Sequence, residues 1–320
     1  MPLYFFSFFY AVMAMAFMVP LAIKLGFRYG IVDHAPCKDS SDQEKPEQRV
    51  KIHCKTTPRS GGIAIFLSFW LAIFLSIGLS QQIIGIFLGS VLVFVVMLVD
   101  DRSNLRPAVK LLAQIVAASI PVFFGVRVYF LSNVFSNNYI AIGWLGVPFT
   151  ILWAVGFMNA LNLIDGMDGL ASGIAGIASL GIVFLSISRM MPIAAIFGMA
   201  LVGVCLVFLK YNFHPAKIFL GDSGAHLLGY LIAMISIWSG LKTTTSVILI
   251  ASFIALGVPI FDIFFSIVIR MKKRKKVYEA DLENIHYQLH RKGWGQRRIA
   301  FFFYSITLLL CLVPYLMLMR

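Results

Sequence analysis

The stretch Asn159-Ala-Leu-Asn162-Leu-Ile-Asp165-Gly-Met-Asp168-Gly169 places an amide or carboxylate side chain at every third position, at the end of an apolar run over 144–163. Polar side chains beside a membrane are costly and are typical of functional sites. Each three-residue step drifts by about 60° around a helix axis, so the four side chains cannot share one face. We therefore predict that the helix ends near Gly166 and that Asp165 and Asp168 form a mouth at the membrane surface.

The composition of the chain is that of a membrane protein. It has 320 residues, of which 60% are hydrophobic and 13% charged, and its mean hydropathy is +0.88. This excludes an ordinary soluble globule and predicts an all-α polytopic integral membrane protein, with one membrane-embedded domain over 1–320. About ten spans are expected, near 3–23, 62–79, 83–99, 108–126, 144–163, 170–187, 191–209, 225–240, 246–269 and 299–319.

The basic residues predict the orientation of these spans. Of the 27 Lys and Arg residues, all but Arg127, Arg189, Lys242 and Arg320 lie in or beside the loops after odd-numbered spans. Because cytoplasmic loops retain positive charge, we expect those loops to be cytoplasmic, both termini to face outward and the active site to lie on the cytoplasmic face. The net charge of +13 then reflects topology and affinity for anionic head groups or phosphates, with no nucleic-acid partner.

Three loops are long enough to carry structure. The first, 24–61, ends in Thr57-Pro58-Arg59-Ser60-Gly61-Gly62, whose glycines allow close approach to another helix or a ligand. The outer loop 127–143 is long enough for a small hairpin or cap, and the last loop, 270–298, contains a predicted amphipathic helix around 279–292.

Two other acidic motifs lie at the ends of predicted spans. Asp100 and Asp101 end the third span, where adjacent carboxylates repel each other unless a cation or proton intervenes; pairing with Arg102 in a solvated loop is the simpler interpretation. The run Phe219-Leu-Gly-Asp222-Ser-Gly224 precedes the eighth span. Asp222 there fits a helix N-cap, but its glycine neighbours also leave room for a phosphate or hydrated Mg²⁺.

The last loop adds histidines. His286 and His290 are four residues apart and would share a helix face suited to a diphosphate, or to lipid head groups in a solvated basic helix. Asp262, inside a predicted span, is interpreted as a structural hydrogen-bonding partner.

Taken together and in this order, these motifs resemble the polyprenyl-phosphate N-acetylhexosamine-1-phosphate transferases of the bacterial cytoplasmic (inner) membrane. The resemblance implies transfer of a sugar 1-phosphate from a UDP-N-acetylaminosugar to undecaprenyl phosphate with release of UMP. This reaction would initiate lipid-linked glycan synthesis for O-antigen or cell-wall polysaccharide. The resemblance also implies a Mg²⁺ or Mn²⁺ requirement, and a homodimer is compatible with it.

The resemblance assigns roles to individual residues. Asp222 would be the metal ligand, Asp100 would deprotonate or position the lipid phosphate, and Asp101 would support it or the metal. Direct attack and a covalent aspartyl intermediate are both compatible with this assignment. Substrate binding would involve Thr57, Arg59, Asn159, Asn162, Asp165, Asp168, His286 and His290.

The chain departs from the family pattern in two places. Members acting on UDP-N-acetylglucosamine usually carry a His-Ile-His-His run in the last loop, whereas this chain has Asn284-Ile-His286-Tyr287. The donor sugar is therefore open. The first loop is about ten residues longer than usual between Pro36 and Arg49, counted against the family pattern.

Other classes fit the sequence less well. An intramembrane Mg²⁺-dependent prenyltransferase would need a second Asp-rich motif, and a CDP-alcohol phosphatidyltransferase would need an Arg and further aspartates after Asp168-Gly-Leu-Ala171. A non-enzymatic ion-coupled transporter would place polar residues near the bilayer midplane, whereas here they gather at one surface.

Overall fold

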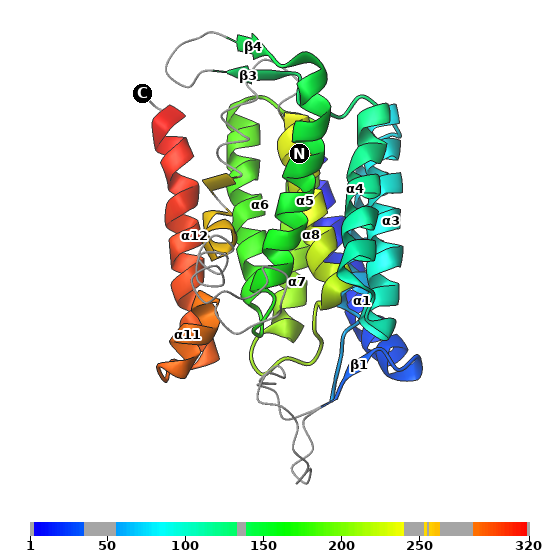
Figure 1. Ribbon diagram of the computed structural model, residues 1–320, viewed down its shortest axis with the longest axis vertical. Coiled ribbons are helices and arrows are strands. Elements are labelled where there is room, and N and C mark those ends of the chain that lie inside the picture. The colour runs from blue at the N-terminus through cyan, green and yellow to red at the C-terminus, as the bar shows by residue number, and fades with distance from the viewer. Residues whose placement is uncertain are drawn as a thin grey trace.

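The computed structural model describes residues 3–34, 56–132, 139–239, 253–254, 256–262 and 284–318. Long helices dominate this part of the chain and run side by side along the long axis of the molecule (Figure 1). The helices are α1 Leu3–Arg28, α2 Gly61–Ser76, α3 Gln81–Ser103, α4 Pro107–Phe123, α5 Gly146–Ile164, α6 Leu170–Ser188, α7 Pro192–Asn212, α8 Gly221–Ser239, α11 Ile285–Arg291 and α12 Gln296–Leu318, with a 3-10 turn, η1, at Gly143–Leu145.

Two short antiparallel strand pairs modify the all-α prediction. The strands β3 (Phe130–Ser132) and β4 (Tyr139–Ala141) form the small hairpin predicted for the outer loop. The strands β1 (Val32–Asp33) and β2 (Thr57–Pro58) close the two ends of the first large loop, which the sequence did not predict. Both pairs link polar connections that lie outside the helices, so the helical class of the protein is unchanged.

The predicted count of about ten spans is not reached within the described residues. Six helices there are long and apolar enough to cross a membrane: α1, α3, α5 with η1, α6, α7 and α12. The apolar helices α2 and α4 have only 16 and 17 residues, about 24 to 26 Å at the usual rise, which is less than the roughly 30 Å hydrocarbon layer. The predicted span 246–269 lies largely outside the described residues.

The helix α8 forms the core of the bundle. It packs against α2, α3, α5, α6 and α7, and its residues from Ala225 to Ile237 are buried. A helix that is apolar on all sides can be surrounded in this way. Since Asp222 lies in its first turn, this central position brings the other helix ends to that carboxylate.

Small residues make the close contacts possible. A Cβ added to Gly62 would lie 2.3 Å from Ser223 Oγ, so only glycine lets α2 approach the start of α8. Gly221 has φ +72° and its α-carbon faces Asp101, so it is favoured there both by its conformation and by the lack of space. The prediction that the glycines after Arg59 allow approach to another helix is confirmed.

The two ends of the bundle differ. In Figure 1, β1 and α11 lie at the lower end, whereas the β3–β4 hairpin and both marked chain ends lie toward the upper end. The ends of α3 and α5 and the start of α8 share the lower end with α11. The acidic motifs therefore meet on one side of the protein, opposite the chain termini.

Candidate active site

The helix α5 ends as its sequence predicts, within two residues of Gly166. Its last residue is Ile164, and Asp165 follows as the C-cap, its backbone N–H donating to Asn162 O at 3.2 Å. Gly169, with φ +75°, then starts α6. The tight turn points Asp165 toward the same cluster as Arg59 and Asp222, and burial raises the pKa of the Asp165 carboxyl while Arg59 opposes that rise.

A cationic side chain lies between two of the predicted carboxylates. Lys110, in the first turn of α4, has its Nζ 2.5 Å from Asp100 Oδ2 and 2.8 Å from Asp222 Oδ2. The other oxygen of Asp100 accepts a hydrogen bond from Leu105 N at 2.7 Å, which fixes the turn between α3 and α4. Lys110 thus resolves the repulsion at the end of α3, and the predicted partner, Arg102, is exposed to solvent instead.

Asp101 makes different contacts from those of Asp100. Its two oxygens accept hydrogen bonds from Asp222 N at 2.7 Å, Ser223 N at 3.0 Å and Ser223 Oγ at 2.6 Å. These backbone groups are the unpaired donors at the start of α8, so Asp101 caps that helix from another one. The alternative that Asp222 itself is the N-cap is wrong: its carboxylate points to Lys110 and Arg59.

Arg59 completes the cluster from the first loop. Its Nη2 lies 3.3 Å from Asp222 Oδ1 and 3.6 Å from Asp101 Oδ1. The backbone holds it there, because Arg59 N donates to Ile31 O, beside β1, and the following Gly61 N donates to Phe219 O. Each oxygen of Asp222 therefore faces one cation, and the Asp222 side chain keeps 16% exposure.

The two predicted asparagines of α5 each contact a neighbouring helix. Asn159 exchanges amide hydrogen bonds with Gln114 of α4, at 2.7 and 3.4 Å. Asn162 Nδ2 lies 3.3 Å from His226 Nε2 of α8, and His226 Nδ1 lies 2.8 Å from Asp222 O. Asn162 is thus linked through His226 to the backbone of Asp222.

Asp168 is held by the connection between α7 and α8. Its Oδ2 accepts hydrogen bonds from His214 Nδ1 at 2.7 Å and Ala216 N at 3.1 Å. The His214 carbonyl in turn accepts two hydrogen bonds from Arg297 of α12. Asp168 therefore lies at the edge of the carboxylate cluster, where it anchors a partly exposed histidine.

The last loop covers the end of α5 by means of α11. Tyr287 Oη donates to Gly166 O at 3.3 Å, and Asn284 Nδ2 donates to Leu163 O at 3.1 Å. Asp262 Oδ1 accepts a hydrogen bond from Ile285 N at 2.7 Å, as the interpretation of a structural hydrogen-bonding partner requires. The helix lies within the predicted segment 279–292, of which residues before 284 fall outside the described part.

The remaining predicted site residues are buried or are held by contacts with nearby residues of the chain. His286 is fully buried, with Nδ1 3.4 Å from Asp262 Oδ2, whereas His290 Nδ1 contacts Trp294 O at 2.9 Å. Both histidines lie in α11 and, four residues apart, share a helix face as predicted, although they contact different partners. Binding of a diphosphate to this face stays a prediction. Thr57 is buried in β2 opposite Asp33.

Four polar residues of the site were missed from sequence. Lys110 and Gln114 lie in the apolar segment 108–126, where a lysine and a glutamine four residues apart mark one polar face of α4. His226 lies four residues after Asp222 and so returns to the same face of α8. His214 had no local signal, because its partner Asp168 is 46 residues away in the chain.

The donor set suits a divalent cation that is completed by its substrate. Within the described ranges no group of three or more His, Cys, Asp or Glu side chains converges on a single ion. Mg²⁺ in phosphoryl-transfer sites commonly takes one or two carboxylates together with water and phosphate oxygens. Asp222 fits this requirement together with Asp100, which lies on the other side of Lys110, or together with Asp165. Asp101 does not, because both of its oxygens already accept hydrogen bonds from the start of α8.

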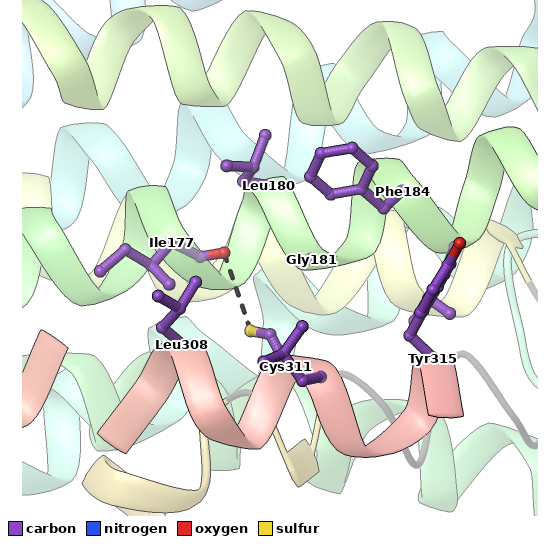
Figure 2. Close-up of a pocket in the computed structure, with 9 residues that line it drawn as sticks. Ile177, Leu180, Gly181, Phe184, Leu308, Cys311 and Tyr315 are labelled. Atoms are coloured by element: carbon purple, nitrogen blue, oxygen red, sulfur yellow. Dashed lines mark hydrogen bonds between the residues drawn. The ribbon is translucent and has the colours of Figure 1, made fainter. Parts of the chain in front are cut away.

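An apolar groove of about 260 Å³ lies elsewhere, between α6 and α12 (Figure 2). Cys311 Sγ contacts Ile177 O across it at 3.8 Å. Its walls on α6 begin seven residues after the start of that helix, or about 10 Å further along it. The groove therefore belongs to the lipid-facing body of the bundle and not to the carboxylate cluster.

Comparison with known proteins places this geometry in a family. Residues 83–240, which contain the acidic motifs of α3, α5 and α8, match the model of glycosyl transferase family 4. The chain is also 33% identical over 303 residues to the Bacillus subtilis protein named "Probable undecaprenyl-phosphate N-acetylglucosaminyl 1-phosphate transferase", covering 94% of this chain and 81% of that one. This chain belongs to glycosyl transferase family 4.

Other relatives within this family carry related names. A decaprenyl-phosphate N-acetylglucosaminephosphotransferase of Mycobacterium tuberculosis is 30% identical, with 81% of this chain and 71% of that protein covered. A phospho-N-acetylmuramoyl-pentapeptide-transferase of Listeria monocytogenes is also 30% identical, with 94% of this chain and 93% of that protein covered. These names confirm the resemblance to the polyprenyl-phosphate N-acetylhexosamine-1-phosphate transferases that the sequence motifs indicated.

Proposed function

We propose that this family member transfers an N-acetylhexosamine 1-phosphate from a UDP-sugar to undecaprenyl phosphate and releases UMP. The observation that carries the proposal is the arrangement around Asp222, whose two oxygens face Arg59 and Lys110 beside Asp100. Cations that neutralise a half-buried carboxylate in the free enzyme are also the groups that can bind phosphates when substrates enter. The names of the relatives support the same reaction.

The proposed reaction exchanges one phosphoric anhydride bond for another. An oxygen of the lipid phosphate bonds to the sugar-bearing phosphorus of the UDP-sugar, and the bond from that phosphorus to the bridging oxygen breaks. UMP leaves with the electron pair. Because two anions must approach each other, Lys110 and Arg59 would hold phosphate oxygens and offset their charge.

We further propose that Asp222, together with Asp100 or Asp165, holds Mg²⁺ or Mn²⁺. The ion supplies additional positive charge for the diphosphate when bound. Asp101 serves in this scheme as the residue that fixes the start of α8 and so positions Asp222. In this scheme the nucleotide-sugar would lie near the Asp168–His214 pair and near α11, which contacts the end of α5.

For the membrane arrangement we propose ten crossings with both termini outside and the active site at the cytoplasmic face of a bacterial inner membrane. The helices α2, α4 and α8 lie in the same bundle as the six long spans. The helices α8 and α12 both run from the site end toward the opposite end (Figure 1). A homodimer stays a prediction, which crosslinking in native membranes tests.

The function is tested by incubating membranes with undecaprenyl phosphate, Mg²⁺ and a panel of UDP-sugars. We expect UMP release that depends on both substrates, with one N-acetylaminosugar preferred. No release with any donor from folded protein would contradict the proposal. Transfer of a prenyl group with release of diphosphate, or ion flux without chemistry, would support the prenyltransferase or transporter alternative instead.

A further inference from the structure

The residue His226 is buried beside the site. It lies on α8 one turn after Asp222, and only 1% of its surface is exposed. Both ring nitrogens have partners: Nδ1 lies 2.8 Å from Asp222 O, and Nε2 lies 3.3 Å from Asn162 Nδ2. The imidazole therefore bridges the helix of the metal-ligand candidate and the helix that ends in the acidic turn.

The partners determine where the ring proton lies. A carbonyl oxygen can only accept, so Nδ1 carries the hydrogen and donates to Asp222 O. Nε2 lies 3.3 Å from Asn162 Nδ2, and an amide NH₂ group can only donate. Nε2 is then an acceptor, and it requires the NH₂ group of Asn162, not the carbonyl, to face it.

The contact with His226 fixes the orientation of the Asn162 amide. With Nδ2 directed to His226, Oδ1 points away from the ring, and within the described residues no side chain or backbone group donates to it. We infer that His226 is a positioning residue that presents the carbonyl oxygen of Asn162 to the UDP-sugar, as an acceptor for a hydrogen-bond donor of that substrate. The inference deepens the proposed function and rests on it.

The bridge is not needed to hold α5 and α8 together. Further along the same two helices, Trp153 Nε1 donates to Ser236 Oγ at 3.0 Å. Gly229 also lets α8 approach the backbone of Phe157 and Met158, since a Cβ there would lie 2.5 Å from Phe157 O. These contacts fix the pair of helices independently, so the link between His226 and Asn162 is free to serve the site.

Two substitutions at His226 separate the two hydrogen bonds. In His226→Asn the shorter amide can still reach Asp222 O but no longer reaches Asn162, whereas in His226→Gln the terminal carbonyl oxygen can replace Nε2 as the acceptor. We expect His226→Asn to raise the KM for UDP-N-acetylglucosamine, or for the preferred donor of the panel, about tenfold, the size of one lost hydrogen bond. The kcat should change less than the KM, and His226→Gln should recover most of the affinity.

Binding and coupling measurements complete the test. Titration calorimetry of the purified protein with the same UDP-sugar should give the same loss of affinity without turnover. In a double-mutant cycle, Asn162→Ala combined with His226→Asn should bind as weakly as Asn162→Ala alone, because both remove one interaction. Ser236→Ala, which breaks the other polar link between α5 and α8, is the matched control and should keep the affinity of the unmodified chain.

The outcomes distinguish this inference from the proposed function. Unchanged affinity in His226→Asn, fully additive losses in the double variant, or an equal loss in Ser236→Ala would each overturn the positioning role while leaving the transferase proposal intact. Failure of the unmodified protein to bind or use any UDP-sugar would overturn both. If His226→Asn fails to fold, His226→Ala takes its place in the cycle, because it also removes the acceptor for Asn162.

Discussion

The adjacent aspartates Asp100 and Asp101 make different contacts although their side chains are identical. Asp100 faces Lys110 and the turn after α3, whereas Asp101, one residue later and about 100° around the helix, caps the start of α8. Asp222 lies between these contacts and has a cation at each oxygen. We therefore propose that Asp222 and Asp100 take part in the reaction, whereas Asp101 positions the start of α8.

Replacement of Asp222 is predicted to remove activity but not the fold. In Asp222→Asn the carboxylate that faces Arg59 and Lys110 becomes neutral and loses its value as a ligand for a divalent ion. We expect kcat/KM to fall at least about 100-fold, as is usual when a central electrostatic group is lost. UMP release measures this loss, and membrane insertion should be unchanged; full activity in the variant would remove Asp222 from the site.

Replacement of Asp101 is predicted to reduce stability first. In Asp101→Asn an NH₂ group meets the donors at Asp222 N, Ser223 N and Ser223 Oγ. We expect the free energy of unfolding to fall by about 2 kcal/mol, as for lost hydrogen bonds to a charged group. Thermal unfolding in detergent measures it, with Asp222→Asn as the matched loss of one negative charge; equal Tm values in the two variants would contradict the capping role.

At the level of elements, the approach of α2 to α8 depends on one missing side chain. A Cβ at position 62 would lie 2.3 Å from Ser223 Oγ and 2.7 Å from Gly224 N. The same contact aligns Arg59, two residues before α2, with Asp222 at the start of α8. The glycine pair after Arg59 is therefore part of the site, although it carries no chemistry.

A single methyl group at this contact should disturb both fold and activity. We expect Gly62→Ala to lower the free energy of unfolding by about 1 to 3 kcal/mol, the usual cost of overpacking. Gly78→Ala is the control, because a Cβ at Gly78 meets nothing within 4 Å. If the two variants unfold at the same temperature, α2 and α8 do not pack as closely as described.

At the level of the whole molecule, both marked chain ends lie toward the end opposite the carboxylate cluster (Figure 1). Within the described residues, the basic side chains of the connections lie mostly on the cluster side, and the positive-inside rule predicts that this side is cytoplasmic. The orientation of the protein in the membrane therefore also determines which compartment supplies the UDP-sugar.

Labelling of single cysteines tests this orientation. In a chain without its four native cysteines, a membrane-impermeant maleimide added to intact cells should label Met190→Cys, between α6 and α7. It should not label Lys292→Cys, after α11. Both positions are exposed, so accessibility of the side chain does not differ between them. The reverse pattern would invert the proposed topology.

Removal of divalent cations is predicted to stop the reaction. The carboxylates of Asp222 and Asp100 share a single lysine, so two phosphate-bearing substrates need further positive charge at this end of the bundle. We expect chelation by EDTA to abolish UMP release and excess Mg²⁺ or Mn²⁺ to restore it. Activity that persists in EDTA would contradict the proposed metal site.

Much of the architecture was readable from local sequence. Runs of apolar residues predict helices because burial in lipid depends on each segment's own composition, and the end of α5 followed from the spacing of Asn159, Asn162, Asp165 and Asp168. The number of crossings was less certain, since α2 and α4 are shorter than a bilayer and rely on neighbours.

Local sequence was enough to establish a helical membrane protein with acidic side chains gathered at one set of helix ends. The packing of the bundle was needed to see which carboxylates meet Lys110 and Arg59, that Asp101 caps α8, and that His226 contacts Asn162. The difference arises from distance along the chain. Hydropathy and helical period act over a few residues, whereas the contacts of Asp222 with Arg59 and of His226 with Asn162 join residues 163 and 64 positions apart. Their meeting depends on how the whole bundle packs.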